Sequence, residues 1–235
     1  MKISLQAFFR ILLLISIPAL YFYPFTVTTF VFSVLLALSL KSLIGKKRGY
    51  INILLFMVIL LAGVFASGYQ IDHNVAINNV TNSQRGEHPN FQTNIFAKIL
   101  HNKTTSAMFY LQNLNDRLSI SSVFVAGSYP NLSKYLPLGF LFPWYLVGFV
   151  LALKRKYPVY LRTSFLTALS ILLILTSIFS RTSSEIFMFA LIWFTCLESV
   201  EQLIKSPKII IYLLVVLNLI YLGIFLASKN VFLNI

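Results

Sequence analysis

The sequence predicts an all-α, polytopic integral membrane protein with about seven transmembrane helices and an external, interfacial helical cap. Hydrophobic residues make up 58% of the 235-residue chain, against about 45 to 50% in soluble domains. Charged residues make up only 11%, and they are absent from residues 163–180 and 209–228. Each stretch can cross a hydrocarbon core about 30 Å thick at a rise of about 1.5 Å per residue. These observations exclude a soluble globular protein.

Seven apolar segments follow one another, at residues 4–22, 25–42, 51–68, 137–153, 163–180, 186–203 and 209–227. They divide the chain into a three-helix membrane segment (1–68), an external loop (69–136) and a four-helix membrane segment (137–235). Only Tyr23 and Pro24 separate the first two segments, which predicts a tight helical hairpin with Arg10 snorkelling toward the interface. A cleaved signal peptide is the alternative, but the run ends in aromatic residues without a small-residue cleavage pattern.

The distribution of Lys and Arg predicts the orientation of these helices. With the amino terminus in the cytoplasm, three connections rich in basic residues lie inside. They contain Lys41, Lys46, Lys47 and Arg48, then Lys154, Arg155, Lys156 and Arg162, and finally Lys205 and Lys208. The short external connections carry only Arg181, and an odd number of spans leaves the carboxyl terminus outside. This asymmetry, with attraction to anionic lipid in the bilayer, accounts for the net charge of +13 without a nucleic-acid partner.

The long external loop is the only large polar region, and it contains all three histidines. Residues 70–90 are rich in Asn, Ser and Thr and predict irregular chain. From Phe91 to Leu118 apolar residues recur at three-and-four spacing, which predicts an amphipathic helix, broken once near Asn102. This helix should lie flat at the interface or dock on the helix bundle, and so roof the membrane domain.

Scattered polar groups must carry any chemistry, because the sequence contains no P-loop, dinucleotide-binding or metalloprotease motif. The single cysteine, Cys196, excludes an intrachain disulfide and a Cys-rich zinc site. Asp72 and Glu87 in the external loop are candidates for a general acid or base, or for a divalent-metal site. Alternatively they are solvated loop residues, since their spacing fits no defined metal site.

Cationic side chains at the outer surface suggest a phosphate-binding role. These are Arg85, Lys98, His101, Lys103, Arg117 and Arg181. Converging cations stabilise charge on a lipid-linked phosphate, although contact with anionic headgroups favours the same residues. Within the membrane, Glu198 and Glu201 are candidate binding groups for a proton or a cation. An i,i+4 ion pair between Glu201 and Lys205 is the simpler interpretation.

Several motifs in and after the loop resemble a known family. They are residues 82–87 (NSQRGE), 99–103 (ILHNK), 114–119 (LNDRLS), Val123-Phe124 with Gly127, and 135–140 (YLPLGF). In this order they resemble the external loop and following helix of bacterial glycosyltransferases of the GT-C class, related to protein O-mannosyltransferases and lipid A aminoarabinose transferases. The resemblance spans about residues 70–200, and the connection at 181–189 resembles a later external turn of the family.

The resemblance implies a bacterial plasma-membrane enzyme that transfers sugar from a polyprenyl-phosphate-linked donor at the outer face. The chain departs from the family in one respect. Family members carry a catalytic carboxylate in a first external loop, whereas the connection at Tyr23 and Pro24 contains no acid. We therefore expect a split, truncated or inactive relative, with a partner protein supplying an amino-terminal catalytic half. The alternative is a non-enzymatic membrane scaffold that docks a partner protein through the external loop.

Overall fold

The computed structural model describes residues 5–44, 49–68, 70, 103–124, 139–160, 162–205 and 207–232, and all regular structure in these ranges is helical. The prediction of an all-α protein is confirmed for this part of the chain. The helices are α1 (Leu5–Ile15), α2 (Pro18–Phe22), α3 (Val27–Ile44), α4 (Gly49–Ala66), α7 (Lys103–Leu118), α8 (Ile120–Phe124), α9 (Pro143–Tyr160), α10 (Thr163–Ile178), α11 (Arg181–Leu203) and α12 (Lys208–Phe232).

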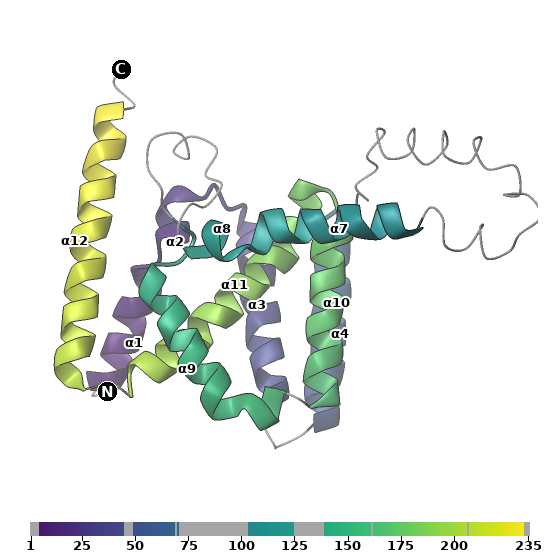
Figure 1. Ribbon diagram of the computed structural model, residues 1–235, viewed down its shortest axis with the longest axis horizontal. Coiled ribbons are helices and arrows are strands. Elements are labelled where there is room, and N and C mark those ends of the chain that lie inside the picture. Colours follow the sequence, from purple (N-terminus) through teal and green to yellow (C-terminus); the bar gives the residue numbers. More distant parts are fainter. Residues whose placement is uncertain are drawn as a thin grey trace, which may run out of the picture.

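α11 is the central helix of the bundle. It packs against α1, α3, α9 and α10, while α4 packs on α3 and α12 packs on α1 (Figure 1). Most of the α11 side chains are buried, including both ionisable and aromatic groups. Helices on its periphery leave many large apolar side chains exposed. The core therefore forms around one helix, and the outer faces of the bundle remain apolar.

The first apolar segment is broken into two helices, where the sequence predicted one. Because Pro18 lacks a backbone N–H, it cannot continue the hydrogen-bond ladder of α1 and instead begins α2. The side chain of Ser16 at the break donates to the carbonyl of Leu13, 3.1 Å away. The backbone N–H of Ala19 donates across to the carbonyl of Phe140 at 3.2 Å.

The fourth apolar segment also differs from its predicted bounds of 137–153. Its helix, α9, begins at Pro143 and continues to Tyr160, past the basic run of residues 154–156. Proline is favoured at the first helical position, where a missing N–H costs nothing. Gly148 in α9 lies against α11, so closely that a Cβ atom there would stand 2.9 Å from the carbonyl oxygen of Ser199. The glycine therefore permits the close α9–α11 approach.

The cap crosses one end of the bundle. α7 runs across the ends of α10 and α11, and α8 follows it against α9 (Figure 1). α7 begins at Lys103, one residue after the predicted break near Asn102. The first part of the predicted amphipathic helix, residues 91–102, lies outside the described residues. The prediction that this helix docks on the bundle holds for α7.

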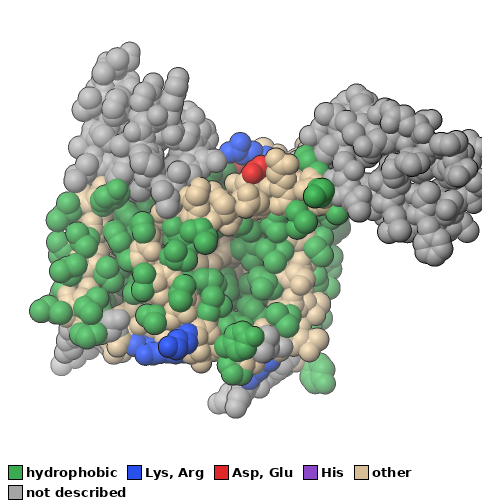
Figure 2. Space-filling view, viewed as in Figure 1, with side chains coloured by type: hydrophobic (Ala, Val, Ile, Leu, Met, Phe, Trp, Pro, Cys, Tyr) green, Lys and Arg blue, Asp and Glu red, His purple; other side chains and the backbone are tan. Residues whose placement is uncertain are grey.

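Two helices, α3 and α11, are long and apolar enough to cross a membrane by length and composition. Shorter apolar helices cover Gln6–Ile15, Tyr50–Ala66, Thr163–Ile178 and Ile209–Tyr221. Figure 2 shows one face of the molecule, on which apolar side chains form a broad band between charged groups at the two ends.

Candidate functional site

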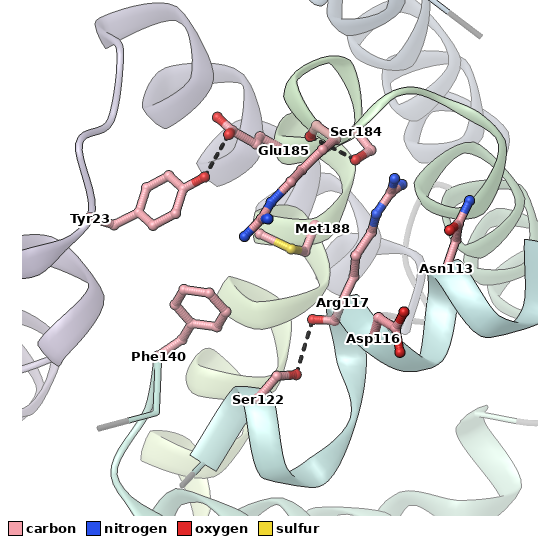
Figure 3. A pocket seen from close by; sticks show the side chains of 10 residues that line it. Tyr23, Asn113, Asp116, Arg117, Ser122, Phe140, Ser184, Glu185 and Met188 are labelled. Atoms are coloured by element: carbon pink, nitrogen blue, oxygen red, sulfur yellow. Dashed lines mark hydrogen bonds between the residues drawn. The ribbon is translucent and has the colours of Figure 1, made fainter. Parts of the chain in front are cut away.

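A polar cavity of about 290 Å³ lies beneath α7, at the amino-terminal end of α11 (Figure 3). Its polar lining mixes two guanidinium groups, two carboxylates, an amide and hydroxyl groups. It is lined by Tyr23, Asn113, Asp116, Arg117, Ser122, Phe140, Arg181, Ser184, Glu185 and Met188. The lining comes from the α2–α3 connection, the cap, the segment before α9, and α11. We call this the outer cavity, after the orientation predicted from the sequence.

The first turn of α11 forms one wall of the outer cavity. Ser180 caps the helix, since its side chain accepts a hydrogen bond from the N–H of Ser183. Arg181 and Glu185 then lie one turn apart on the same face, and both line the cavity. The backbone of Gln70 is tied to this turn, because the N–H of Ser180 donates to its carbonyl at 2.7 Å. Gln70 is thereby fixed at the first turn of α11.

A hydrogen bond joins the α2–α3 connection to α11. The hydroxyl of Tyr23 donates to Oε1 of Glu185 at 2.5 Å (Figure 3). Burial and this neighbouring carboxylate raise the pKa of Tyr23 above its ordinary value, so the hydroxyl remains a donor. The tyrosine ring packs against Phe189, with centroids 4.5 Å apart, and against Phe140 at 5.9 Å. The carboxylate of Glu185 is thus held by a packed aromatic side chain.

Arg117 anchors the cap to the bundle. Its guanidinium donates to the carbonyl of Thr176 and, at 2.9 Å, to that of Phe179. Asn113, one turn earlier in α7, donates to the carbonyl of Ser177 at 3.4 Å. These carbonyls belong to the carboxyl-terminal end of α10, where a positive charge is favourable. The sequence predicted that the guanidinium of Arg117 binds a phosphate. In the structure Arg117 lines the cavity, but its guanidinium donates to α10 and holds α7 in place.

α7 ends at Leu118 and α8 begins at Ile120, which forms the α7–α8 corner. An apolar groove of about 580 Å³ lies at this corner, next to the outer cavity. Leu118, Ile120, Val123 and Phe124 line it from the cap, and side chains of α9, α10 and α11 complete it. On α11 the outer cavity uses residues up to Met188, and the groove begins at Leu191, about one turn further along. A polar and an apolar site are thus adjacent along a single helix.

The opposite end of α11 contains a second group of charges, the inner cluster. Nζ of Lys156 lies 2.9 Å from Glu198 and 3.1 Å from Glu201. Nζ of Lys41 lies 2.9 Å from Glu201 and 3.5 Å from Glu198. The hydroxyl of Tyr160 donates to Glu198 at 2.5 Å. The predicted Glu201–Lys205 pair is also present, at 3.6 Å. The cluster therefore joins α3, α9 and α11.

Two of the predicted phosphate-binding residues, Arg117 and Arg181, meet in the outer cavity. Lys103 is the first residue of α7, but its side chain is not among those that the structure describes. The other candidates lie outside the described residues. They are Arg85, Lys98 and His101 for phosphate, and Asp72 and Glu87 for acid–base or metal chemistry. Within the described ranges no group of three or more His, Cys, Asp and Glu could hold a metal ion.

The sequence did not single out Glu185, Tyr23 or Asn113 as site residues. One signal was present for Glu185, which follows Arg181 by four residues at the start of an apolar helix. Its contact with Tyr23 joins residues 162 positions apart and follows only from the tertiary structure. Comparisons with models of protein families, with curated proteins and with solved structures found no match.

Proposed function

We propose that this chain is a seven-span membrane protein that binds a polyprenyl-phosphate-linked sugar at the outer face of a bacterial plasma membrane. The apolar outer faces of the helices support membrane insertion. Leu54 in α4 is 66% exposed and Leu213 in α12 is 59% exposed, and comparable side chains occur on α3, α9 and α10. Such surfaces are costly in water and favourable in lipid. α1 and α2 together would form the first span.

Charge asymmetry supports the orientation with the cap outside. Of the basic residues whose side chains the structure describes, six belong to the end of the bundle where α3, α9 and α11 terminate. They are Lys41, Lys154, Arg155, Lys156, Arg162 and Lys205. At the cap end the described side chains include only Arg117 and Arg181 as cations. The positive-inside rule assigns the first end to the cytoplasm and the cap to the outside.

The observation that carries the ligand assignment is the adjacency of the outer cavity and the apolar groove. A lipid-linked sugar has a hydroxyl-rich head, a phosphate and a long hydrocarbon chain. The cavity offers a cation at Arg181, beside the amino terminus of α11, where an anion is favoured. The groove offers an apolar surface between the cap and α9, α10 and α11, which would accept a hydrocarbon chain. Head and chain would lie on the two sides of the α7–α8 corner.

The resemblance to GT-C glycosyltransferases extends the proposal to a transferase-related role. A partner protein carrying an amino-terminal catalytic half would complete such an enzyme. Co-purification from native membranes of a partner with an acidic external loop would support a split enzyme. If the chain alone binds no lipid-linked sugar and a partner docks on its external loop, the chain is a scaffold instead.

A transport function has little support from the inner cluster. A proton or cation carrier needs a carboxylate that can exchange its bound ion. Glu198 is fully buried and Glu201 partly so, and both are paired with Lys41 and Lys156. The two carboxylates are already neutralised by protein ammonium groups. The cluster therefore favours a role in holding three helices together.

Binding of the ligand to the purified full chain tests the proposal. We expect Arg181→Ala to weaken binding of a polyprenyl-phosphate hexose in detergent at least tenfold, because it removes the cation at the helix terminus. Arg85→Ala and Lys103→Ala test the candidates from the loop. Lys205→Ala is the matched control, since it removes a cation from the opposite end of the same helix. Unchanged binding in Arg181→Ala, Arg85→Ala and Lys103→Ala would refute the phosphate assignment.

A further inference from the structure

We infer that Glu185, positioned by Tyr23, binds the sugar hydroxyls of the lipid-linked ligand and makes the outer cavity selective for a glycosylated over a bare lipid phosphate. The inference rests on the proposed function and extends it. The sequence predicted only cations as phosphate-binding groups at this end of the bundle. A carboxylate at the same cavity favours a ligand that also carries hydrogen-bond donors, because it repels phosphate.

Among the residues that the structure describes, only one oxygen of Glu185 has a hydrogen-bond partner. Oε1 accepts the hydrogen bond from Tyr23 at 2.5 Å. Oε2 accepts no hydrogen bond from the side chains and backbone that the structure describes. The side chain is half-buried and lines the cavity. A partly desolvated carboxylate oxygen facing a cavity is a strong acceptor for hydroxyl donors.

The positions of Arg181 and Glu185 order the two parts of the ligand. They lie one helical turn apart, with about 5 to 6 Å between their Cβ atoms. A phosphate is attracted to Arg181 and repelled by Glu185, whereas neutral hydroxyl groups can donate to Glu185. A phosphate and the sugar attached to it span a comparable distance. The two side chains therefore match a sugar phosphate better than a phosphate alone.

Aromatic side chains form an apolar wall beside the carboxylate. Tyr23 and Phe140 both line the cavity (Figure 3). Both rings pack against Phe189, at centroid distances of 4.5 and 5.2 Å, so their positions are fixed by the core. Such rings offer an apolar surface to the C–H face of a sugar ring. The volume of about 290 Å³ is far above the space that a single ordered water needs, and it can admit a group as large as one monosaccharide ring.

The test compares two probes on the full chain in detergent: a polyprenyl phosphate carrying one neutral hexose, and the same polyprenyl phosphate without sugar. For the unmodified chain we expect the glycosylated probe to bind about tenfold more tightly. Glu185→Gln should bring this ratio close to one, while the affinity for the bare lipid phosphate is unchanged or rises. Tyr23→Phe removes only the positioning hydroxyl and should lower the ratio about threefold. Glu201→Gln is the matched control and should leave the ratio unchanged.

The remaining outcomes separate failure of the inference from failure of the proposed function. If Glu185→Gln keeps the full ratio, or loses both probes equally, Glu185 does not select the sugar. If the unmodified chain binds both probes equally, lipid-phosphate binding stands and sugar selection is overturned. If it binds neither probe, the proposed function fails, and the inference fails with it.

Discussion

Carboxylates and cations meet at both ends of α11, but the two ends use them differently. At the inner end, Glu198 and Glu201 are paired with lysines from α3 and α9 at 2.9 to 3.5 Å. At the outer end, Glu185 accepts from Tyr23 and faces a cavity together with Arg181. Charged side chains that form ion pairs between helices stabilise the bundle, whereas charged side chains that face a cavity are available to a ligand. Residue type alone does not distinguish the two roles.

Removing Glu198 should have the largest effect on stability. Glu198 is fully buried, and breaking a buried ion pair by removing one partner costs about 3 to 5 kcal/mol. We expect Glu198→Ala to lower the free energy of unfolding by this amount, measured by denaturant titration in detergent. Glu198→Leu combined with Lys156→Met should recover more than half of the loss, because Glu201 is then no longer shared by Lys41 and Lys156 and the buried position is filled by an apolar side chain. A loss below about 1 kcal/mol, the range of exposed pairs, would contradict the structural role.

The next largest effect should come from the α9–α11 contact. In Gly148→Ala the new Cβ would meet backbone atoms of Ser199 at 2.9 and 3.1 Å, which cannot move aside independently. We expect a loss of about 1 to 3 kcal/mol from overpacking, measured in the same titration. Gly223→Ala is the control, since nothing lies within 4 Å of a Cβ there. It should be neutral or stabilise α12 by up to about 1 kcal/mol. Equal behaviour of the two variants would refute close packing at Gly148.

Arg117 lines the outer cavity, but we expect it to stabilise the docking of α7 on α10 and not to bind the ligand. Arg117→Ala removes donors to the carbonyls of Thr176 and Phe179, and hydrogen bonds from charged groups contribute about 1.5 to 3 kcal/mol. We expect faster hydrogen exchange of the α7 amides, by about tenfold or more. Arg181→Ala should leave α7 protection unchanged and weaken lipid binding instead. If Arg117→Ala leaves the hydrogen exchange of the α7 amides unchanged but weakens lipid binding, Arg117 binds the phosphate instead.

Much of the helical framework was predictable, because apolar runs are a local property of the sequence. The bounds of α10, predicted as 163–180, differ by two residues from the observed Thr163–Ile178. α9 was displaced because Pro143 sets its beginning, and its polar last turns follow from contacts with α11 that no local pattern encodes. The seven-span arrangement itself remains part of the proposal.

The charged sites were predictable only where their partners are close in sequence. The Glu201–Lys205 pair has the spacing of one helical turn and was predicted. The contacts of Glu201 with Lys41 and Lys156 join separate helices, and so does the contact of Glu185 with Tyr23. Arg117 and Arg181 were selected for their charge, but charge alone could not show that one of them binds helix carbonyls. Only the packing of the helices reveals these differences.

The smallest expected effect is the response of the inner cluster to pH. Hydrogen bonds and charge from Glu198 and Glu201 outweigh burial and raise the pKa of Lys156 above 10.5. Burial, with the same carboxylates, raises the pKa of Tyr160 above 10. Both side chains lie beyond the apolar part of α9. A group whose pKa is raised on folding stabilises the protein fully below its unfolded value and loses that contribution as the pH rises.

The free energy of unfolding should therefore be insensitive to these two groups between about pH 6 and 9, and their contribution should decline above about pH 10. Tyr160→Phe keeps the ring against Phe165 and Phe194 but removes the hydroxyl that donates to Glu198. We expect its stability deficit to be constant below pH 9 and to shrink in more alkaline solution, as the unmodified chain loses the same contribution. Tyr157→Phe, an exposed tyrosine in the same helix turn, is the control for general alkaline effects. A deficit that grows with pH would reverse the sign of the coupling and separate Tyr160 from the inner cluster.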